Sequence, residues 1–121
     1  MARLDAEMLD QILTTLREYA EKNLPVAKLL EIELGHEFPE KIMKDLYDPG
    51  QIGLHLLTIP EEFGGLGGGA YDIYRVSEAM AAIDLGIATG VLATFLGTDP
   101  INVGATPEQK ADWLGALAEH G

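Results

Sequence analysis

Apolar residues recur three and four positions apart along most of this chain, and that spacing is the strongest constraint on its fold. The first such segment places apolar or aromatic side chains at Leu4, Met8, Leu9, Ile12, Leu13, Leu16 and Tyr19. Because an α-helix completes a turn in about 3.6 residues, this spacing gathers the apolar side chains on one helical face. Nearly the whole sequence follows the same pattern. We therefore expect an all-α fold, a compact bundle of five or six helices.

Prolines mark the starts of the next two predicted helices, since proline suits the first helical turn. One helix should run from Pro25 to Gly35, where the glycine would cap its C-terminal end. Its inward positions would be Val26, Leu29, Leu30 and Leu34. Another should begin at Pro39 and end or kink at residues 48–50. Its inward positions would be Ile42, Met43 and Leu46.

The last helix is predicted from a capping box, in which Thr106 and Gln109 bond each other's backbone around Pro107. Its buried side would consist of Trp113, Leu114 and Leu117. An earlier helix should begin near Asp72, because a carboxylate is favourable at the positive end of the helix dipole. Its core positions would be Ile73, Val76, Met80 and Ile83.

Residues 51–59 are apolar without a helical period, so they could form a strand or a buried loop. The glycine-rich turn that follows contains Gly65, Gly67 and Ala70 in a G-x-G-x-x-A pattern, with Asp84 further along. That order is typical of dinucleotide-binding sites. However, residues 60–63 separate the apolar run from the glycines, and no second strand is predicted after the helix. We therefore interpret the glycines as a turn.

Two neighbouring stripes of side chains mark residues 81–97. Large residues occupy Ile83, Ile87, Val91 and Phe95, and small ones occupy Ala82, Gly86, Gly90 and Thr94. Each glycine inside a helix costs about 1 kcal/mol relative to alanine, so some gain should offset it. One interpretation is close packing of another helix against Gly86 and Gly90. The other is room for an apolar ligand beside Ala88, Thr89, Leu92 and Ala93.

Charge and composition exclude several classes of function. The net charge is −12, from 8 Lys and Arg against 20 Asp and Glu, which disfavours binding to nucleic acid or to anionic membranes. The chain has no cysteine, and hence no thiolate nucleophile or cysteine-ligated metal. His36, His55 and His120 lie far apart without a second ligand at helical spacing, so we predict no metal site. No catalytic residue is predicted in this chain.

The most apolar stretch, residues 79–96, is interrupted by Asp84, which leaves an uncharged run too short to cross a bilayer. The N-terminus also lacks the basic-then-apolar order of a signal peptide. A soluble, cytoplasmic protein without a membrane span is therefore expected.

Two groups of motifs resemble the N-terminal domain of the acyl-CoA dehydrogenases. The first is Gly53-Leu54 followed by the run from Thr58 to Gly67, which reads TIPEEFGGLG. The second is Asp99-Pro100-Ile101, Gly104, the run from Thr106 to Lys110, Trp113-Leu114, Leu117-Ala118 and Gly121. Phe38-Pro39 also opens a helix as is common in that family. The resemblance covers nearly the whole chain, and the order and spacing of the motifs carry it.

The resemblance implies a flavoenzyme that uses FAD to convert an acyl-CoA thioester into a trans-2-enoyl-CoA. In that family a glutamate removes the α-proton and flavin N5 takes the β-hydride. Residues 1–121 would then be only the N-terminal helical domain of a homo-oligomer, with the middle β-domain and the C-terminal helical bundle absent. The FAD contacts and the catalytic glutamate would lie mostly in those absent domains. We therefore expect this chain alone to be inactive and free of FAD.

The resemblance also implies that the helix over residues 85–97 lines one wall of the acyl-chain pocket. The wall residues would be Ala88, Thr89, Leu92, Ala93 and Leu96. A non-enzymatic helical interaction domain remains an alternative, as does an acyl-CoA oxidase or another flavoprotein on the same scaffold.

Overall fold

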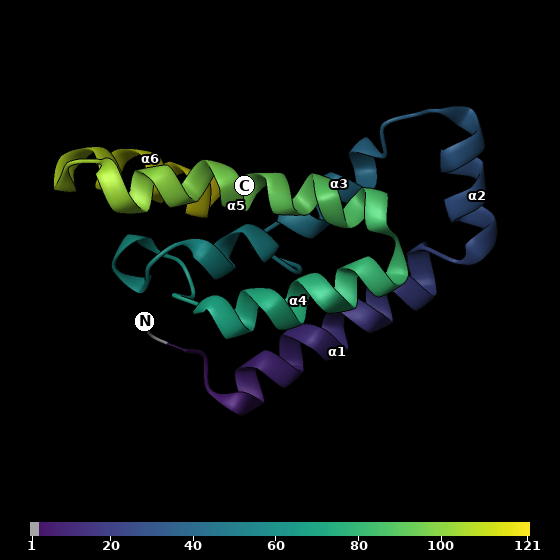
Figure 1. Ribbon diagram of the computed structural model, residues 1–121, viewed down its shortest axis with the longest axis horizontal. Helices are drawn as coiled ribbons and strands as arrows, with labels where there is room; N and C mark the ends of the chain where they lie inside the picture. The colour runs from purple at the N-terminus through teal and green to yellow at the C-terminus, as the bar shows by residue number, and fades with distance from the viewer. Residues whose placement is uncertain (1–2) are drawn as a thin grey trace.

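A computed structural model describes residues 3–121, which form six α-helices and two short 3₁₀ helices and contain no strand (Figure 1). The α-helices are α1 (Ala6–Asn23), α2 (Val26–Gly35), α3 (Glu40–Tyr47), α4 (Ala70–Ile83), α5 (Leu85–Gly104) and α6 (Pro107–His120). The 3₁₀ helices are η1 (Leu54–Thr58) and η2 (Glu61–Phe63). The prediction of an all-α fold with five or six helices is thus confirmed.

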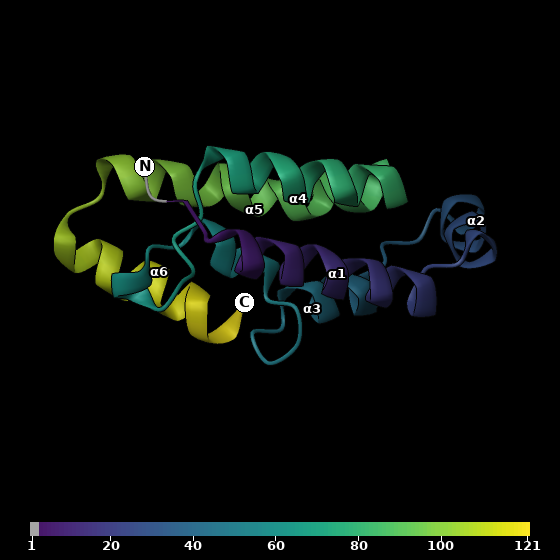
Figure 2. The ribbon, with the colours of Figure 1, turned by 90° about the horizontal axis from the view of Figure 1, so that it is seen from below.

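The helices are arranged around α4 and α5, which pack side by side (Figures 1 and 2). α1 packs along the other side of α4, while α3 and α6 contact α5. The 3₁₀ helix η1 is enclosed by α3, α4, α5 and α6, and its Leu54 and Leu57 are completely buried. The main core joins these two leucines to Leu16, Leu46 and Val91. This arrangement makes a short segment of weak sequence signal the centre of the fold.

A second, smaller apolar cluster holds α6 in place. Its buried members are Ile59, Leu114 and Ala118, with Leu117 packed against them. The predicted capping box is present: the backbone N–H of Gln109 donates to the hydroxyl of Thr106 and the backbone N–H of Thr106 donates back to Gln109. Trp113, in contrast, is 49% exposed and was wrongly placed on the buried side. α6 contacts the core through a narrow strip of its surface. This strip includes Leu114 but not the neighbouring residue Trp113.

Three of the four inward positions predicted for α2 are wrong. Val26, Leu30 and Leu34 are exposed, whereas Leu29 packs on the core as predicted, together with Ile32. α2 stands at one end of the bundle (Figure 1), so only one edge of it meets other helices. Its C-terminal cap is His36, with φ of 51°, and not Gly35, which is the last helical residue.

Residues 51–59 form neither a strand nor an irregular loop. Gly53 adopts a left-handed conformation with φ of 61°, and η1 starts at the next residue. A five-residue 3₁₀ helix is too short to show a period in the sequence. Most of the segment is nevertheless buried, which agrees with the burial expected in the prediction of a buried loop.

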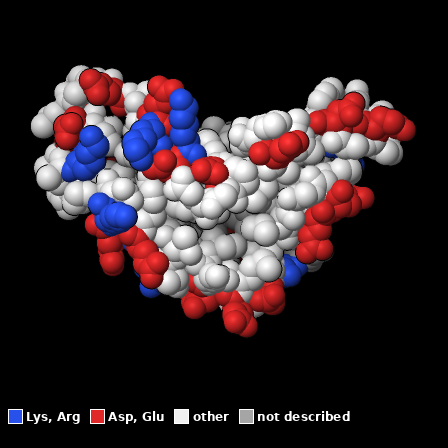
Figure 3. All heavy atoms as spheres, turned by 180° about the vertical axis from the view of Figure 1, so that it is seen from behind, with Lys and Arg blue, Asp and Glu red and all other residues white. Residues whose placement is uncertain are grey.

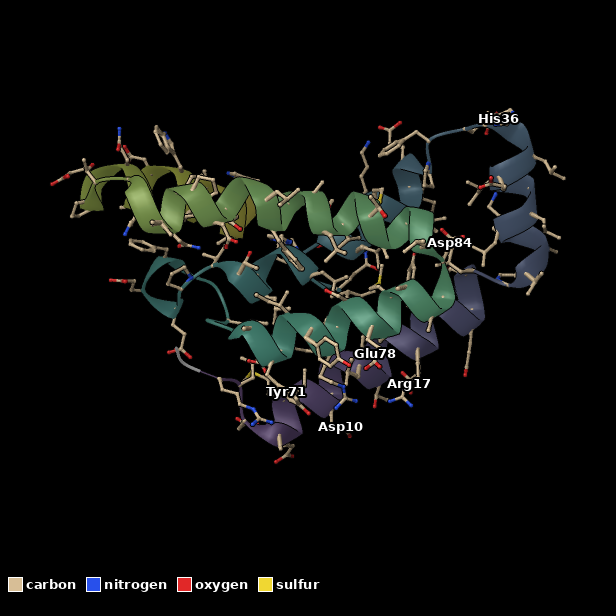
Figure 4. The ribbon with its side chains drawn as sticks, in the orientation of Figure 1. Asp10, Arg17, His36, Tyr71, Glu78 and Asp84 are labelled. Carbon is tan, nitrogen blue, oxygen red and sulfur yellow. The ribbon has the colours of Figure 1, made fainter. Side chains whose placement is uncertain are left out.

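The turn at Asp84 divides two helices that the stripe pattern alone does not separate. α4 ends at Ile83, and the carboxylate of Asp84 accepts a hydrogen bond from the backbone N–H of Ile87 (2.8 Å), which caps α5. Figure 4 shows Asp84 at this corner. α5 then continues through Pro100 to Gly104. Across residues 3–121, we find no helix with the length and apolar character needed to cross a membrane.

Candidate functional site

The glycine-rich turn, residues 64–69, allows the chain to pack closely against the rest of the protein. Every backbone N–H from Gly64 to Gly69 donates to an acceptor inside the protein; those acceptors are the carbonyl groups of Glu61, Pro60, Leu56, Ile59 and Leu57 and the carboxylate of Asp72. A phosphate-binding loop needs such groups free to point at its ligand. A Cβ atom at Gly65 would also overlap the backbone of Ile59. The turn therefore does not fit a dinucleotide phosphate.

The most distinctive surface is one side of α5, which we call the outer face of α5. It consists of Leu85, Thr89, Leu92, Ala93, Leu96 and Val103. Leu96 is 76% exposed and Leu92 is half-buried. The hydroxyl of Thr89 donates to the carbonyl oxygen of Leu85 (2.8 Å), so its polar group is already bonded. No ionisable side chain lies between residues 85 and 98.

This surface contains four of the five residues predicted to line an acyl pocket. Thr89, Leu92, Ala93 and Leu96 follow one another at helical spacing on the outer face. Ala88 is completely buried and belongs to the main core, beside Ile87 and Val91. The structure thus brings four of the predicted residues together and places the fifth behind them.

The stripe of small residues has two different explanations along its length. A Cβ atom at Gly90 would lie 3.1 Å from the methyl group of Met43, so this glycine allows α3 to pack closely on α5. At Gly86 the one neighbour within contact distance among residues 3–121 would be the carboxylate of Asp84, the N-cap residue of α5. Close packing therefore accounts for Gly90 but not for Gly86.

Tyr47 of α3 fixes α5 from behind. Its hydroxyl donates to the carbonyl oxygen of Gly90 (3.0 Å) and accepts from the hydroxyl of Thr94 (2.7 Å). Burial raises the pKa of Tyr47, although the bond from Thr94 acts in the opposite direction. The phenol is therefore neutral and keeps its proton for the bond to Gly90.

A second set of bonds fixes the C-terminal half of α5. The hydroxyls of Thr98 and Thr58 are 3.0 Å apart, and the side-chain amide of Asn102 donates to the carbonyl oxygen of Thr58 (3.0 Å). The roles of Tyr47, Thr58 and Asn102 leave no signal in the sequence, because their partners lie 40 or more positions away. Together these bonds set the rotation of α5 and hence what its outer face presents.

We predict that Tyr47→Phe lowers the free energy of unfolding by about 1–2 kcal/mol, since it removes both bonds and leaves the carbonyl group of Gly90 with one partner fewer. Urea denaturation followed by circular dichroism measures the change. Tyr74→Phe is the matched control, because Tyr74 is exposed and its hydroxyl makes no recorded bond. Equal stability of the two variants would contradict the role of Tyr47.

Two cavities border α5 but neither is lined by its predicted wall residues. One, of about 420 Å³, lies between α2, α3 and the first turns of α5, at Gly86, Ile87 and Gly90. The other, of about 820 Å³, lies between the glycine-rich turn and the last turns of α5, at Asn102 and Val103. Thr89, Ala93 and Leu96 are exposed, so this part of the outer face of α5 is an open surface. Figure 3 shows the molecule from behind, the side away from α4 and α5, where charged groups surround a broad uncharged area.

The known proteins that this chain resembles all belong to one family. The family described as "Acyl-CoA dehydrogenase, N-terminal domain" matches residues 6–120. The short-chain specific acyl-CoA dehydrogenase, mitochondrial, of Sus scrofa is 35% identical over 113 residues, which cover 89% of this chain and 25% of the relative. The Homo sapiens protein of the same name is 36% identical over 115 residues, covering 89% of this chain and 26% of the relative.

A more distant relative is the probable medium-chain specific acyl-CoA dehydrogenase 2, mitochondrial, of Caenorhabditis briggsae. It is 29% identical over 97 residues, which cover 80% of this chain and 23% of the relative. No solved structure matches the chain significantly. The chain spans about a quarter of the length of these curated relatives. Because the family match extends over nearly every residue, this chain belongs to the acyl-CoA dehydrogenase N-terminal domain family.

Proposed function

We propose that this chain is the N-terminal helical domain of a longer FAD-dependent acyl-CoA dehydrogenase, and that the outer face of α5 forms part of its acyl-chain pocket. The family match and the names of the relatives, which are short-chain and medium-chain specific acyl-CoA dehydrogenases, support the class of enzyme. The proposed reaction is α,β-dehydrogenation of an acyl-CoA thioester to a trans-2-enoyl-CoA. A homo-oligomeric parent protein is part of the same proposal.

The observation that carries the pocket assignment is the composition of the outer face of α5. Thr89, Ala93 and Leu96 offer an exposed surface without charge on a chain whose net charge is −12. A saturated acyl chain gains about 0.8 kcal/mol for each methylene that such a surface removes from water. Ala88 would shape the wall from behind, because its small side chain lets Leu92 lie close to the core.

The chemistry itself is assigned to parts of the enzyme beyond these residues. When FAD is bound, it accepts the hydride that leaves the β-carbon. The glycine-rich turn does not fit the cofactor, because its backbone N–H groups are already bonded within the protein. Glu61 and Glu62, the carboxylates beside that turn, are exposed and have no recorded partner that would hold them as a base. We propose that the 121-residue chain alone neither binds FAD stoichiometrically nor oxidises acyl-CoA.

A non-enzymatic interaction domain is the second candidate. The exposed residues Val26, Leu30, Leu34 and Phe38 on and after α2 favour it, since apolar residues gathered on a surface mark contact sites. In the enzyme this surface would contact the rest of the subunit or another subunit. The cytoplasmic location stays a prediction; the names of the relatives place those proteins in mitochondria.

The pocket assignment predicts that Ala93→Phe in the full-length enzyme changes chain-length selectivity. The added ring would occupy space on the outer face of α5, so kcat/KM for long acyl-CoA substrates should fall about tenfold or more relative to butyryl-CoA. Steady-state assays across a series of chain lengths measure the ratio. Ala116→Phe, at an exposed position of α6, is the matched control and should leave the ratio unchanged.

Two results would separate the parts of the proposal. An unchanged ratio in an active Ala93→Phe enzyme would overturn the wall assignment while leaving the enzyme class intact. A full-length wild-type protein that binds FAD but oxidises no acyl-CoA of any length would overturn the enzyme class.

A further inference from the structure

His55 is a completely buried histidine in η1 for which sequence analysis found no role. Its ring lies edge-on to that of Tyr47, with the ring centres 6.0 Å apart and the planes at 76°. Among residues 3–121, neither Nδ1 nor Nε2 finds a hydrogen-bond partner. The carbonyl group of Ala118 on α6 is close enough to favour a proton on the ring, but its geometry falls short of a hydrogen bond. A buried imidazole is expensive unless its nitrogens are bonded.

The position of His55 connects the two apolar clusters. Tyr47, which touches one side of the ring, packs on the main core. Ala118, whose carbonyl group also lies near the ring, belongs to the small cluster with Ile59 and Leu114 that holds α6. The ring therefore fills the junction between α6 and the rest of the protein.

The charges around His55 do not compensate for its burial. Burial lowers its pKa, while the Ala118 carbonyl and the carboxylate of Asp48, at the end of α3, raise it by smaller amounts. α5 has no ionisable side chain between residues 85 and 98. On α4 the buried carboxylate of Asp72 accepts hydrogen bonds from the backbone N–H groups of Leu4 and Gly69, and not from His55. Asp48 is thus the charged side chain that favours a proton on His55, and the charged or titratable neighbours of Ala118 on α6, Glu119 and His120, are exposed to solvent.

We propose that His55 makes the attachment of α6 to the core sensitive to pH: the neutral ring fits the junction, and a protonated ring opens it to water. A charged imidazolium needs hydration, which only separation of the surrounding elements supplies. α6 is the element that separates most readily, because only the small cluster of three buried residues holds it. The helices α1, α4 and α5 are held by the much larger main core. This inference is independent of the proposed enzyme activity.

The direction of the pH effect follows from the two protonation equilibria. In the opened state His55 regains its ordinary pKa of about 6.5, and in the closed state its pKa is lower. The opened state therefore binds more protons, so the closed state is fully favoured above pH 6.5 and loses stability as the pH falls below it. The opening equilibrium rises by at most tenfold per pH unit, so the increase between pH 7 and pH 5 is at most about 25-fold and is smaller the less the closed state lowers the pKa of His55.

Native-state hydrogen exchange on the 121-residue chain tests the inference. Exchange of the α6 amides, corrected for the intrinsic pH dependence of exchange, should reveal opening that increases severalfold, up to about 25-fold, between pH 7 and pH 5. The amides of α1 and α4 should show a smaller increase. The fluorescence of Trp113, the only tryptophan and a residue of α6, gives a second record of the same opening.

His55→Leu should remove the pH dependence from α6, because leucine fills a similar volume and does not titrate. His120→Gln is the matched control, since His120 lies exposed on the same helix, and it should keep the full pH dependence. If His55→Leu fails to fold, His55→Met replaces it with a more adaptable side chain. A titration of wild-type ring resonances by NMR needs no variant.

Three results would overturn the inference. They are an α6 opening that does not change between pH 7 and pH 5, a pH dependence that survives in a folded His55→Leu or His55→Met variant, and a His55 ring that titrates near 6.5 while α6 stays protected.

Discussion

Gly65→Ala is expected to lower the free energy of unfolding by about 3 kcal/mol or more. The new Cβ atom would overlap the carbonyl group and the Cβ atom of Ile59. Because that carbonyl oxygen also accepts the N–H of Gly67 (2.9 Å), moving it away disturbs the turn itself. Overpacking against side chains typically costs about 1–3 kcal/mol, and rigid backbone leaves less freedom to relax.

Gly115→Ala is the matched control for this experiment. A Cβ atom at Gly115, in the middle of α6, would meet nothing within 4 Å. Alanine there should stabilise the protein by about 1 kcal/mol, because it favours the helix over the unfolded chain. Urea midpoints measured at constant m give both values. A Gly65→Ala variant as stable as the wild-type protein would show that the turn does not pack on η1 as described.

Asp72→Ala is expected to destabilise the protein by about 3 kcal/mol. The carboxylate of Asp72 is completely buried at the start of α4, where its Oδ2 accepts from the backbone N–H groups of Gly69 (2.8 Å) and Leu4 (3.0 Å). Alanine would leave two buried donors without a partner, and each costs about 1–3 kcal/mol. It would also release residues 3–5 from their position against α4.

Asp5→Ala separates the loss of buried bonds from the loss of a helix cap. Asp5 caps α1 by accepting from the N–H of Met8 (2.7 Å), but it does so on the surface. In the variant, water can bond the N–H group of Met8 instead, so the free energy of unfolding should fall by about 1 kcal/mol. Equilibrium denaturation compares the two variants. Equal losses would mean that the bond from Leu4 contributes nothing, and that Asp72 acts only as a helix-terminal charge.

The elements that could be predicted from the sequence are those with local causes. The capping box at Thr106 and Gln109 is correct, because both partners lie three residues apart and the bonds form within one turn. The start of α4 near Asp72 follows from the same kind of local rule. The large stripe of Ile87, Val91 and Phe95 is buried, as its spacing predicted.

The errors concern which side of a helix meets the core. In α2, Leu29 packs on the core as predicted, but Leu30 and Leu34 are exposed and Ile32 contacts the core in their place. Spacing identifies an apolar face, yet only the neighbouring helices decide how much of it is covered. The same reason explains Ala88: adjacent residues of a helix lie about 100° apart around its axis, so Thr89 lies on the outer face of α5 while Ala88 lies in the core.

The sequence by itself determined the family, the all-α class and most helix boundaries, because motifs, caps and helical period depend on residues within a few positions of one another. Only the tertiary structure decided the roles of Asp72, Tyr47 and His55. Each of them acts through a partner 8 to 68 positions away, and no local pattern specifies which distant segment will come to lie beside it.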